Sequence, residues 1–495
     1  MKIRPVMLAF VLVVAAIVRL DTIGPRTEFL GDQGVIATEL YQAFHQGHLP
    51  ETGLVHSNGI RSGPILYYLL APSFFLSRAN PIGMAIFMAL LGVATVYLLF
   101  LLGEKLYGTA PAFLVAGLYA VSPLIATQSR AIWPPALLPF FSIVALCGLV
   151  LMDQKRNPAW LIIVSTACAV MSQMYIPALP SVLFFGISSL FVLVRLRKSN
   201  SAKTLLFWLV LAAVCFFIIW FPYLKYESAH AFEDIRAFIL TTVFPAEPSS
   251  ALASSIADRV SLVRSVFEKL LPLQSQLAAL FGGILVVIAL AVGTFWGRVL
   301  VFWYAVSSLP ILVFKGPTFE HYAATLLPLP FLLLGFLLRR LFAYSRYLAL
   351  SMGLFLLFLQ LSTGSKVPIY NDLARTKSVV DEMVAQAKGR DFSFTLLSSR
   401  SFSDYHYRYF FLRKGITPRI IYEDKYPILF LVCEHSTCPS WDDLRKRGII
   451  AVLCYEEFCN PSYPDKRLTG WMLAREVDIE GAHLLTLRMN AVQLP

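Results

Sequence analysis

Apolar runs of about twenty residues recur along most of the chain, and this repetition limits the possible folds more than any other feature. An α-helix rises 1.5 Å per residue, so roughly 17 to 25 apolar residues can cross the hydrocarbon core of a membrane. The first run lacks a small-residue cleavage site and many runs follow it, so we interpret it as a membrane helix and not as a signal peptide. We therefore predict a polytopic α-helical membrane protein with about eleven spans, at 6–22, 81–103, 110–127, 135–152, 158–174, 177–194, 204–222, 276–295, 298–314, 322–338 and 346–363.

The placement of basic residues predicts the orientation of these spans. Only 15% of the residues are charged, against about 25% in ordinary soluble domains, which supports a membrane protein. The net charge of +12 could suggest nucleic-acid binding, but much of it lies in short loops between apolar runs, where lysine and arginine set the topology. With the N-terminus in the cytoplasm, the short segments on that side contain Lys105, Lys155, Arg156, Arg195, Arg197, Lys198, Lys203, Arg298, Arg339, Arg340 and Arg346. This agrees with the positive-inside rule. We expect a multi-pass plasma or inner membrane protein whose segment 24–80 and C-terminal part are extracytoplasmic.

One shorter apolar run, at 63–77, decides the parity of this topology. It contains two prolines and is only about fifteen residues long. If it crossed the membrane, every later basic cluster would lie outside. We therefore interpret it as a helix at the outer interface, where Tyr67 and Tyr68 suit the aromatic belt, and we keep a short tilted span as the alternative.

The sequence divides into a transmembrane domain at 1–363, whose outer loop 24–80 carries the predicted active site, and an extracytoplasmic α/β domain at 364–495. After the last apolar run the pattern becomes that of a soluble domain of ordinary size. Short apolar runs predict strands at Phe392–Leu397, Ile428–Cys433, Ile449–Cys454 and Leu484–Leu487. Helices are predicted from the Asn371-Asp372 cap to about Gly389, at Tyr405–Arg413 and at Trp441–Arg447.

Four cysteines are confined to the C-terminal domain, namely Cys433, Cys438, Cys454 and Cys459. On an oxidising outer face an even number predicts two disulfides, with three connectivities open. A zinc site built from two CxxxxC pairs is the alternative, and its spacing is looser than that of the usual CxxC pairs.

Asp32 is the best candidate for a catalytic residue. It lies between Gly31 and Gly34 in the polar segment that follows the first span, which we interpret as a loop. A carboxylate there can accept a proton from an incoming hydroxyl group. Glu28 lies four residues earlier and would share a face with Asp32 if the segment were helical. The simpler alternative is that both are solvated loop acids.

Cationic side chains at the predicted outer ends of several spans are candidates for binding a phosphate. Arg61 lies where the first loop returns to the membrane, Arg130 lies in the next outer loop, and Lys315 and His321-Tyr322 lie at a third outer position. Arginine binds phosphate with strong, directional hydrogen bonds. The alternative is that single basic residues snorkel to the interface. Three segments that meet on one face favour the phosphate interpretation.

The sequence contains none of the common nucleotide-binding or hydrolase motifs in a supporting context. No acidic pair follows Ser129-Arg130, where a divalent cation could otherwise bridge a diphosphate. We predict no cofactor, without excluding a divalent metal.

Four short motifs, in order along the membrane part, resemble the C-type membrane glycosyltransferases. The branch is that of the protein O-mannosyltransferases and the lipid A aminoarabinose transferases. The motifs are Arg19-Leu20-Asp21 with Gly31-Asp32-Gln33, Gly63-Pro64-Ile65-Leu66-Tyr67-Tyr68, Ser129-Arg130, and His321-Tyr322 with Leu326-Leu327-Pro328. The family usually has Asp-Glu where this chain has Asp32-Gln33, and often an acidic residue after the Ser-Arg, where this chain has Trp133.

The resemblance implies transfer of a sugar from a polyprenyl-phosphate carrier to an acceptor on the outer face, with inversion at the anomeric carbon. The expected partners are this lipid-linked donor, membrane lipids, and a lipid, glycan or protein acceptor, with no nucleic acid. One alternative is a flippase or transporter of lipid-linked sugars, which would place charges in the middle of spans, where this sequence has almost none. Another is a sensor without catalysis, which leaves the elaborate first loop unexplained.

Overall fold

The structure, a computed structural model, describes residues 3–56, 59–242, 254–271, 275–291, 294–314, 318–363, 368–401, 403–422, 426–434, 438–451 and 465–489. The chain forms two compact units. The first comprises Met1–Ile23, Pro50–Leu76 and Gly83–Pro368, and the second comprises Gly24–Leu49, Ser77–Ile82 and Ile369–Pro495. The segment Gly24–Leu49, which we assigned to the membrane domain as part of its outer loop, therefore clusters with the C-terminal domain.

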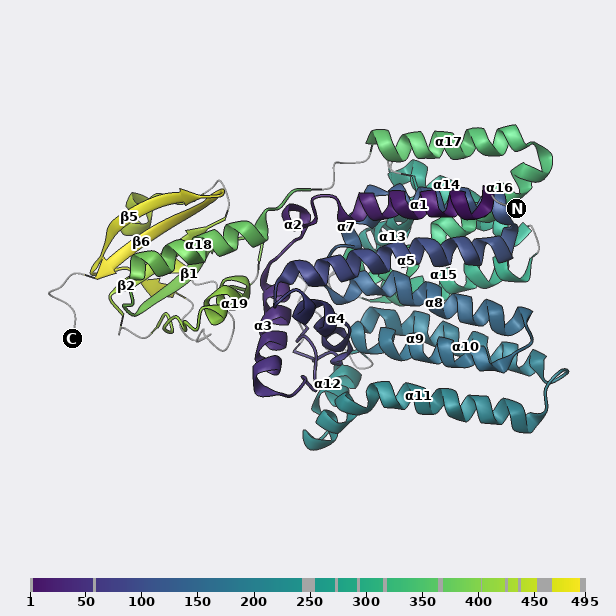
Figure 1. The fold of residues 1–495 in the computed structure, drawn as a ribbon, viewed down its shortest axis with the longest axis horizontal. Helices are drawn as coiled ribbons and strands as arrows, with labels where there is room; N and C mark the ends of the chain where they lie inside the picture. The colour runs from purple at the N-terminus through teal and green to yellow at the C-terminus, as the bar shows by residue number, and fades with distance from the viewer. Residues whose placement is uncertain are drawn as a thin grey trace. The chain divides into compact units, whose positions relative to one another are not determined.

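The first unit is a bundle of helices. In Figure 1 its long helices α1, α5, α8, α9, α10 and α11 run nearly parallel, and α9 packs against α8, α10 and α11. Its α-helices are α1 (Ile3–Leu20), α4 (Ile65–Leu76), α5 (Pro81–Tyr107), α6 (Thr109–Val121), α7 (Pro123–Gln128), α8 (Pro134–Gln154), α9 (Leu161–Met174), α10 (Leu179–Leu196), α11 (Ala202–Ala229), α12 (Glu233–Thr242), α13 (Ile256–Ser265), α14 (Ser275–Ala291), α15 (Phe295–Val313), α16 (Leu329–Tyr344) and α17 (Arg346–Thr363). Short 3-10 helices are η1 (Pro158–Trp160), η2 (Ile176–Ala178), η3 (Val266–Lys269) and η4 (Glu320–Leu326), and α2 (Ile23–Arg26) joins the two units in sequence.

Helices cover most of every apolar run that we predicted to span the membrane. Among the described residues, five helices are long and apolar enough to cross a membrane, or six if the bent pair η4 and α16 counts as one span. Proline explains one of the shorter pieces. Pro123 lacks an N–H group and disfavours helical geometry at Ser122, so the predicted span 110–127 is divided into α6 and α7. The predicted number of eleven spans stays a prediction.

Helix α4 corresponds to the short apolar run on which the predicted topology depended. Its 12 residues extend about 18 Å, against a hydrocarbon core of about 30 Å. It buries Leu66, Tyr67, Leu70 and Phe74 within the bundle. A helix of this length is too short to cross a membrane by itself, in agreement with the interfacial interpretation.

The second unit is built on a four-stranded mixed sheet of order β1-β2-β6-β5. β1 (Phe392–Ser398) pairs in parallel with β2 (Ile428–Cys433), and β6 (Ala482–Met489) runs antiparallel to both β2 and β5 (Trp471–Ile479). A separate two-stranded sheet pairs β3 (Ile449–Ala451) with β4 (Asp465–Arg467). The helices of this unit are α3 (Gly31–Gln46), α18 (Asp372–Ala387), α19 (Tyr405–Arg413) and α20 (Trp441–Arg447). Figure 1 shows α18 lying along the sheet, where it contacts β5 and β6.

Most predicted elements of the C-terminal domain are confirmed, but the sequence pattern did not predict the strand β5. Its residues alternate between exposed and partly buried, because β5 is an edge strand and presents charged side chains to solvent. The turn that joins β5 to β6 consists of Glu480 and Gly481, both with positive φ (48° and 83°). This is the geometry of a two-residue hairpin turn whose twist matches the strands.

Candidate active site

Asp32 is the second residue of α3, so the predicted loop is wrong at this point. The segment is helical because Ile36, Leu40 and Ala43 recur at helical spacing and are buried on one face. The side chain of Asp32 is exposed in the first turn. Unpaired N–H groups at the start of a helix favour a carboxylate there. The structure therefore presents Asp32 on a rigid element.

Gly31 and Gly34 allow α3 to lie directly against the chain that enters α19. A Cβ on Gly34 would lie 2.3 Å from the backbone nitrogen of His406, and a Cβ on Gly31 would lie 2.1 Å from Ser403 Oγ. The Gly31 N–H also donates to Ser401 Oγ over 2.9 Å. Both glycines that flank Asp32 are thus required by packing within the second unit.

Glu28 precedes α3, so it does not share a helical face with Asp32, yet the two carboxylates interact. Burial raises the pKa of Glu28, the Arg400 guanidinium lowers it, and the charges of Asp372 and Asp32 raise it. The net direction is upward. Arg400 Nη1 lies 3.5 Å from Glu28 Oε1. Glu28 is half-buried and Asp32 is exposed, so Asp32 is the more accessible of the two acids.

Asp372, which we predicted only as a helix cap, anchors the segment that leads to Asp32. It is fully buried. Its Oδ2 accepts from the Phe29 N–H (3.2 Å) and from Arg400 Nη2 (2.7 Å), and its Oδ1 accepts from Arg375 Nη2 (2.6 Å). Sequence reasoning missed Arg375 and Arg400, because no local pattern indicates which distant residues will pair.

Glu434 connects Arg375 of this polar network to side chains of α19. Its carboxylate accepts hydrogen bonds from Tyr407 Oη (2.8 Å) and Ser399 Oγ, and it lies 3.2 Å from His406 Nε2. Burial raises the pKa of Glu434, but hydrogen bonds from His406 and Ser399 and the charge of Arg375 outweigh it and lower the pKa to about 2. Glu434 is therefore ionised at every physiological pH and holds these groups in place.

In the first unit, Arg61 forms an ion pair that the sequence did not indicate. Its Nη1 lies 3.5 Å from Asp234 Oδ1, and its backbone N–H donates to the same oxygen over 3.2 Å. Its backbone carbonyl accepts from Tyr223 Oη (3.1 Å). The side chain is 36% exposed, whereas that of Asp234 is only 3% exposed. Arg61 is thus fixed at its backbone and partly open at its guanidinium.

A cavity of about 120 Å³ lies beside Arg61. Its lining consists of His56, Ile60, Arg61, Ser62, Gly63, Ser172, Gln173, Tyr175, Ile176, Leu179, Trp220, Tyr223, Asp234, Ile235 and Phe238. Burial lowers the pKa of the His56 imidazole, so this side chain adds no charge at neutral pH. The cavity is apolar and aromatic with a few polar groups, which is typical of small-molecule sites.

Arg130 lies away from this lining and caps a helix. Its Nε donates to the Arg19 carbonyl (2.7 Å) and its Nη2 donates to the Val18 carbonyl, at the C-terminal end of α1. Arg19 does the same for α6, through Tyr119 and Ala120. Cations stabilise the free carbonyls of a helix C-terminus. Arg130 is 1% exposed, and these contacts give it a structural role. Its contact with phosphate stays a prediction.

His321 and Tyr322 belong to an aromatic cluster next to the cavity. The centroid of the His321 ring lies 4.5 Å from the centroid of the Trp133 ring and 5.5 Å from that of the Tyr175 ring. The Tyr322 ring also contacts Tyr175. Since Tyr175 lines the cavity, these two predicted residues and Arg61 meet in one region of the first unit. Lys315 lies outside the described residues.

The comparisons with known proteins agree with the sequence motifs. The family model described as dolichyl-phosphate-mannose-protein mannosyltransferase matches residues 61–223. The crystal structure of ArnT from Cupriavidus metallidurans in the apo state matches with a TM-score of 0.60 and 11% identity over 97% of each chain. The chain therefore has the fold of this ArnT, in agreement with the resemblance of its sequence motifs to the C-type membrane glycosyltransferases.

A second structure of the same C. metallidurans ArnT, bound to undecaprenyl phosphate, matches this chain with a TM-score of 0.52 and 13% identity, again over 97% of each chain. No curated protein sequence matches the chain. At these identities the structural matches show the fold alone, and the chemistry of the chain must be argued from its own residues.

Gln33, where the superfamily branch usually has Glu, has a structural role in this chain. Its side chain is 5% exposed, and its Oε1 accepts the Leu30 N–H at the start of α3 over 2.9 Å. An amide oxygen can serve this purpose as well as a carboxylate. Within the described ranges, no three His, Cys, Asp or Glu side chains are placed to hold a metal ion. The expectation of no cofactor stays a prediction.

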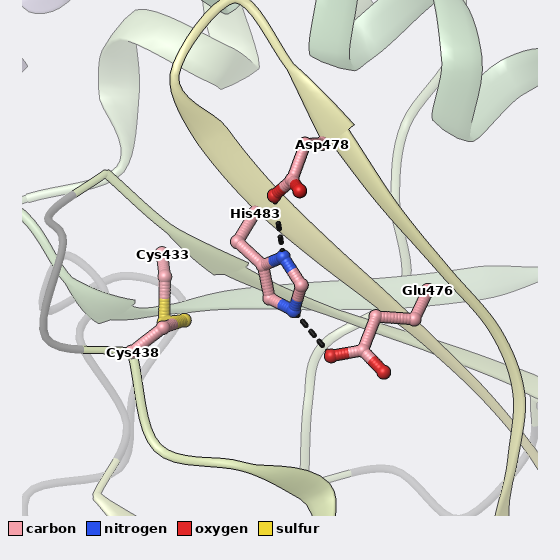
Figure 2. Close-up of a disulfide and its surroundings, with 5 residues drawn as sticks. All are labelled: Cys433, Cys438, Glu476, Asp478 and His483. Carbon is pink, nitrogen blue, oxygen red and sulfur yellow. Dashed lines mark hydrogen bonds and ion pairs between the residues drawn. A yellow bond between two sulfur atoms is a disulfide. The ribbon is translucent and has the colours of Figure 1, made fainter.

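Cys433 and Cys438 form a disulfide with a Cα–Cα distance of 5.7 Å (Figure 2). Cys454 and Cys459 lie outside the described residues, so the second predicted pair stays a prediction.

Figure 2 also shows His483 between Asp478 and Glu476 on the β5–β6 hairpin. His483 Nδ1 lies 2.7 Å from Asp478 Oδ1. Burial lowers the pKa of His483, but the two carboxylates outweigh it and raise the pKa.

Proposed function

We propose that this protein is an inverting membrane glycosyltransferase that moves a sugar from a polyprenyl-phosphate carrier to an acceptor hydroxyl on the outer face. The observation that carries the proposal is the C-type fold over 97% of the chain, combined with Asp32 in the matching motif at the start of α3. A similar protein, ArnT, has been crystallised with undecaprenyl phosphate. The matched family model is named for a sugar donor of the same chemical class, a polyprenyl-phosphate mannose.

In the proposed reaction Asp32 is the general base. Its carboxylate accepts the proton of the acceptor hydroxyl while the hydroxyl oxygen attacks the anomeric carbon. The bond between the anomeric carbon and the phosphate oxygen breaks on the opposite face, which inverts the configuration. The polyprenyl phosphate leaves with the bonding electron pair, so its oxygen gains negative charge in the transition state.

Arg61 is the best-supported group for stabilising this charge. Its guanidinium is partly exposed, and its Nη1 lies 3.5 Å from Asp234 Oδ1. A charge-assisted hydrogen bond to phosphate is about twice as strong as a neutral one. His321 and Tyr322 support Arg61 in this proposal through their contacts with Tyr175. Lys315 is retained because the sequence places it at the predicted outer end of a span. The contacts of Arg130 favour an indirect role, in which it fixes the end of α1.

The orientation is also part of the proposal. The basic residues between apolar runs support a cytoplasmic N-terminus, an outer segment 24–80 and an outer domain after residue 364. The disulfide Cys433–Cys438 supports an oxidising compartment for that domain. Donor and acceptor would then meet on the extracytoplasmic side.

Asp32→Asn tests the catalytic part of the proposal. The substitution keeps the shape of the side chain and removes its ability to accept a proton. Since general base catalysis contributes about 10²–10⁴-fold, release of polyprenyl phosphate from a labelled lipid-linked sugar in membranes of the native host should fall by that factor.

Glu28→Gln is the control, since it removes a neighbouring acid that is half-buried and paired with Arg400. Its effect on turnover should be smaller, while donor binding should survive in both variants. Near-normal release of polyprenyl phosphate by Asp32→Asn would rule out its role as base and would leave Glu28 as the next acid to test.

A further inference from the structure

We propose that Glu227 and Asp234 share one proton and hold a single negative charge against Arg61, so that the two acids position the guanidinium that meets the donor phosphate. This inference rests on the proposed function, in which Arg61 stabilises the leaving phosphate. It goes beyond that function by assigning a role to two buried acids that the sequence did not single out. The contacts of α11 and α12 support it.

Both acids are buried where α11 ends and α12 begins. In Figure 1 α12 lies at the same end of the bundle as α4, which follows Arg61 in the chain. Among the described residues, no N–H or hydroxyl group donates to Glu227 Oε1 or to Asp234 Oδ2. If both acids were ionised, each would keep a buried oxygen without a hydrogen-bond donor, which is costly.

One shared proton removes this cost. The side chains of Glu227 and Asp234 are hydrogen-bonded to each other. Because an ionised carboxylate only accepts hydrogen bonds, this contact requires a proton on one of the two acids. Neighbouring carboxylates with little access to water do not both ionise, since their like charges repel. The pair therefore carries one negative charge, which balances the positive charge of one arginine.

The charge of the pair lies on Asp234, because Arg61 forms its ion pair with this acid. Arg61 Nη1 lies 3.5 Å from Asp234 Oδ1, and the Arg61 N–H donates to the same oxygen over 3.2 Å. The proton then lies on Glu227 Oε1 and is donated to Asp234 Oδ2. Both oxygens are satisfied in this arrangement, and Asp234 stays ionised beside the arginine.

The turn between α11 and α12 holds Glu227 in this place. Ala231 and Phe232 both have positive φ (55° and 58°), which is unfavourable for residues other than glycine. The Glu227 carbonyl accepts the Phe232 N–H (2.7 Å), and its Oε2 accepts the Ile235 N–H (3.1 Å) in the first turn of α12. Unfavourable backbone geometry persists only where surrounding contacts enforce it, and such sites are often functional. One oxygen of Glu227 is therefore fixed by α12, and the other remains for Asp234.

Two further contacts of α11 orient Arg61 without changing the charge beside it. Tyr223 Oη donates to the Arg61 carbonyl over 3.1 Å, and the Arg61 guanidinium carbon lies 5.7 Å from the centroid of the Tyr226 ring. A cation over an aromatic face is held by electrostatic attraction. Arg61 is thus oriented by α11 and α12, and the exposed part of its side chain remains for the donor phosphate.

Infrared spectroscopy of the full-length protein in detergent tests the shared proton. A protonated carboxyl group has a C=O stretching band that is separate from the bands of carboxylates and amides. Ordinary carboxyl groups are ionised at pH 7, so the wild-type protein should show intensity in this region that Glu227→Gln lacks. Equal intensity in the two proteins would overturn the shared proton.

Turnover tests the positioning role. Asp234→Asn keeps the shape of the side chain and removes the charge that pairs with Arg61. Since misplacing a catalytic group by about 1 Å can cost on the order of 10²-fold, release of polyprenyl phosphate from a labelled lipid-linked sugar should fall about 10- to 100-fold. Binding of undecaprenyl phosphate should not weaken, because a negative charge beside Arg61 is removed. Asp153→Asn is the matched control, since Asp153 is also largely buried and pairs with an arginine (Arg195, 3.4 Å), and it should change neither quantity.

Two variants of Glu227 separate its hydrogen bonds from its bulk. Glu227→Ala removes both hydrogen bonds of the side chain, so turnover should fall as in Asp234→Asn. Glu227→Gln can still donate to Asp234 and accept the Ile235 N–H, so it should restore most of the turnover that Glu227→Ala loses. No restoration by a folded Glu227→Gln would contradict the role of these hydrogen bonds.

The remaining outcomes also decide. Turnover of Asp234→Asn equal to that of Asp153→Asn, or a parallel loss of turnover and of affinity for undecaprenyl phosphate, would overturn the positioning role. If Asp234→Asn does not fold, the infrared comparison and the Glu227 variants provide the decision. A folded wild-type protein that releases no polyprenyl phosphate from any lipid-linked sugar would overturn the proposed function, whereas the infrared result would still decide whether the proton is shared.

Discussion

Gly34→Ala should separate α3 from α19 and so disturb the element that carries Asp32. The added Cβ would lie 2.3 Å from the backbone nitrogen of His406 and 2.4 Å from the backbone carbon of Tyr405. Normal separations are about 3.5–4.0 Å, so one of the two segments must move by more than about 1 Å. Backbone atoms cannot rotate away as the end of a flexible side chain can.

The expected loss follows from two opposing contributions. Overpacking a well-packed contact costs typically about 1–3 kcal/mol, and the backbone contact places Gly34→Ala at the upper end. Replacing a helical glycine by alanine gains about 1 kcal/mol. The net destabilisation of the second unit is therefore about 2 kcal/mol, which corresponds to a decrease in melting temperature of roughly 4–8 °C for a unit of this size.

Thermal unfolding of the full-length protein in detergent, at one fixed scan rate, measures this effect. Gly117→Ala is the matched control, since Gly117 lies within α6 and an added Cβ would meet nothing within 4 Å. Gly31→Ala should fall between them, because it meets mainly the side-chain ends of Ser401 and Ser403.

Turnover provides a second measurement. Displacing a catalytic group by about 1 Å can cost on the order of 10²-fold, so release of polyprenyl phosphate by Gly34→Ala should fall even at temperatures where the protein is folded. If Gly34→Ala is as stable as Gly117→Ala and equally active, the close approach of α3 to α19 is wrong.

Three further predictions follow from the geometry. The pKa of Glu434 is lowered from its usual 4.5 to about 2, so its ionised form stabilises the second unit above pH 4.5 by about 3 kcal/mol. This stability is lost as the pH falls toward 2. Circular dichroism during acid titration should therefore show a smaller loss of stability between pH 4.5 and 2 for Glu434→Gln than for the wild-type protein. Arg130→Ala should lower the melting temperature, because it frees the carbonyls at the end of α1, but should leave the affinity for undecaprenyl phosphate unchanged; a selective loss of affinity in a stable protein would instead favour direct phosphate binding. Cysteines introduced at Gln46 and Lys388 should both react with an impermeant thiol reagent in intact cells and a cysteine at Asn200 should not, and labelling of only one of the first two would contradict the predicted topology.

The sequence by itself determined the helical membrane part and most of the C-terminal domain. Long apolar runs can lie in a membrane only as helices, because the backbone N–H and C=O groups in hydrocarbon must form their hydrogen bonds within the segment. The strands at Phe392 and Ile428 could also be predicted from the sequence. The strand at Ile428 is an apolar run of strand length in the centre of the sheet, and the strand at Phe392 begins with alternating apolar and hydroxyl side chains. The sequence also singled out Asp32, through its motif, and Arg61, which lines the cavity.

Only the tertiary structure decided how the residues around these two are arranged. Phe29 and Asp372 are 343 residues apart in sequence and form a hydrogen bond, and Arg61 pairs with Asp234, 173 residues away. No local pattern specifies such pairs, because an aspartate in a soluble helix or loop has the same propensities whether it is solvated or buried against an arginine. The assignment of Gly24–Leu49 to the C-terminal unit has the same cause. The close packing at Gly34 depends on the chain that enters α19. Hydrophobic periodicity predicts which residues are buried, but not which distant segment covers them.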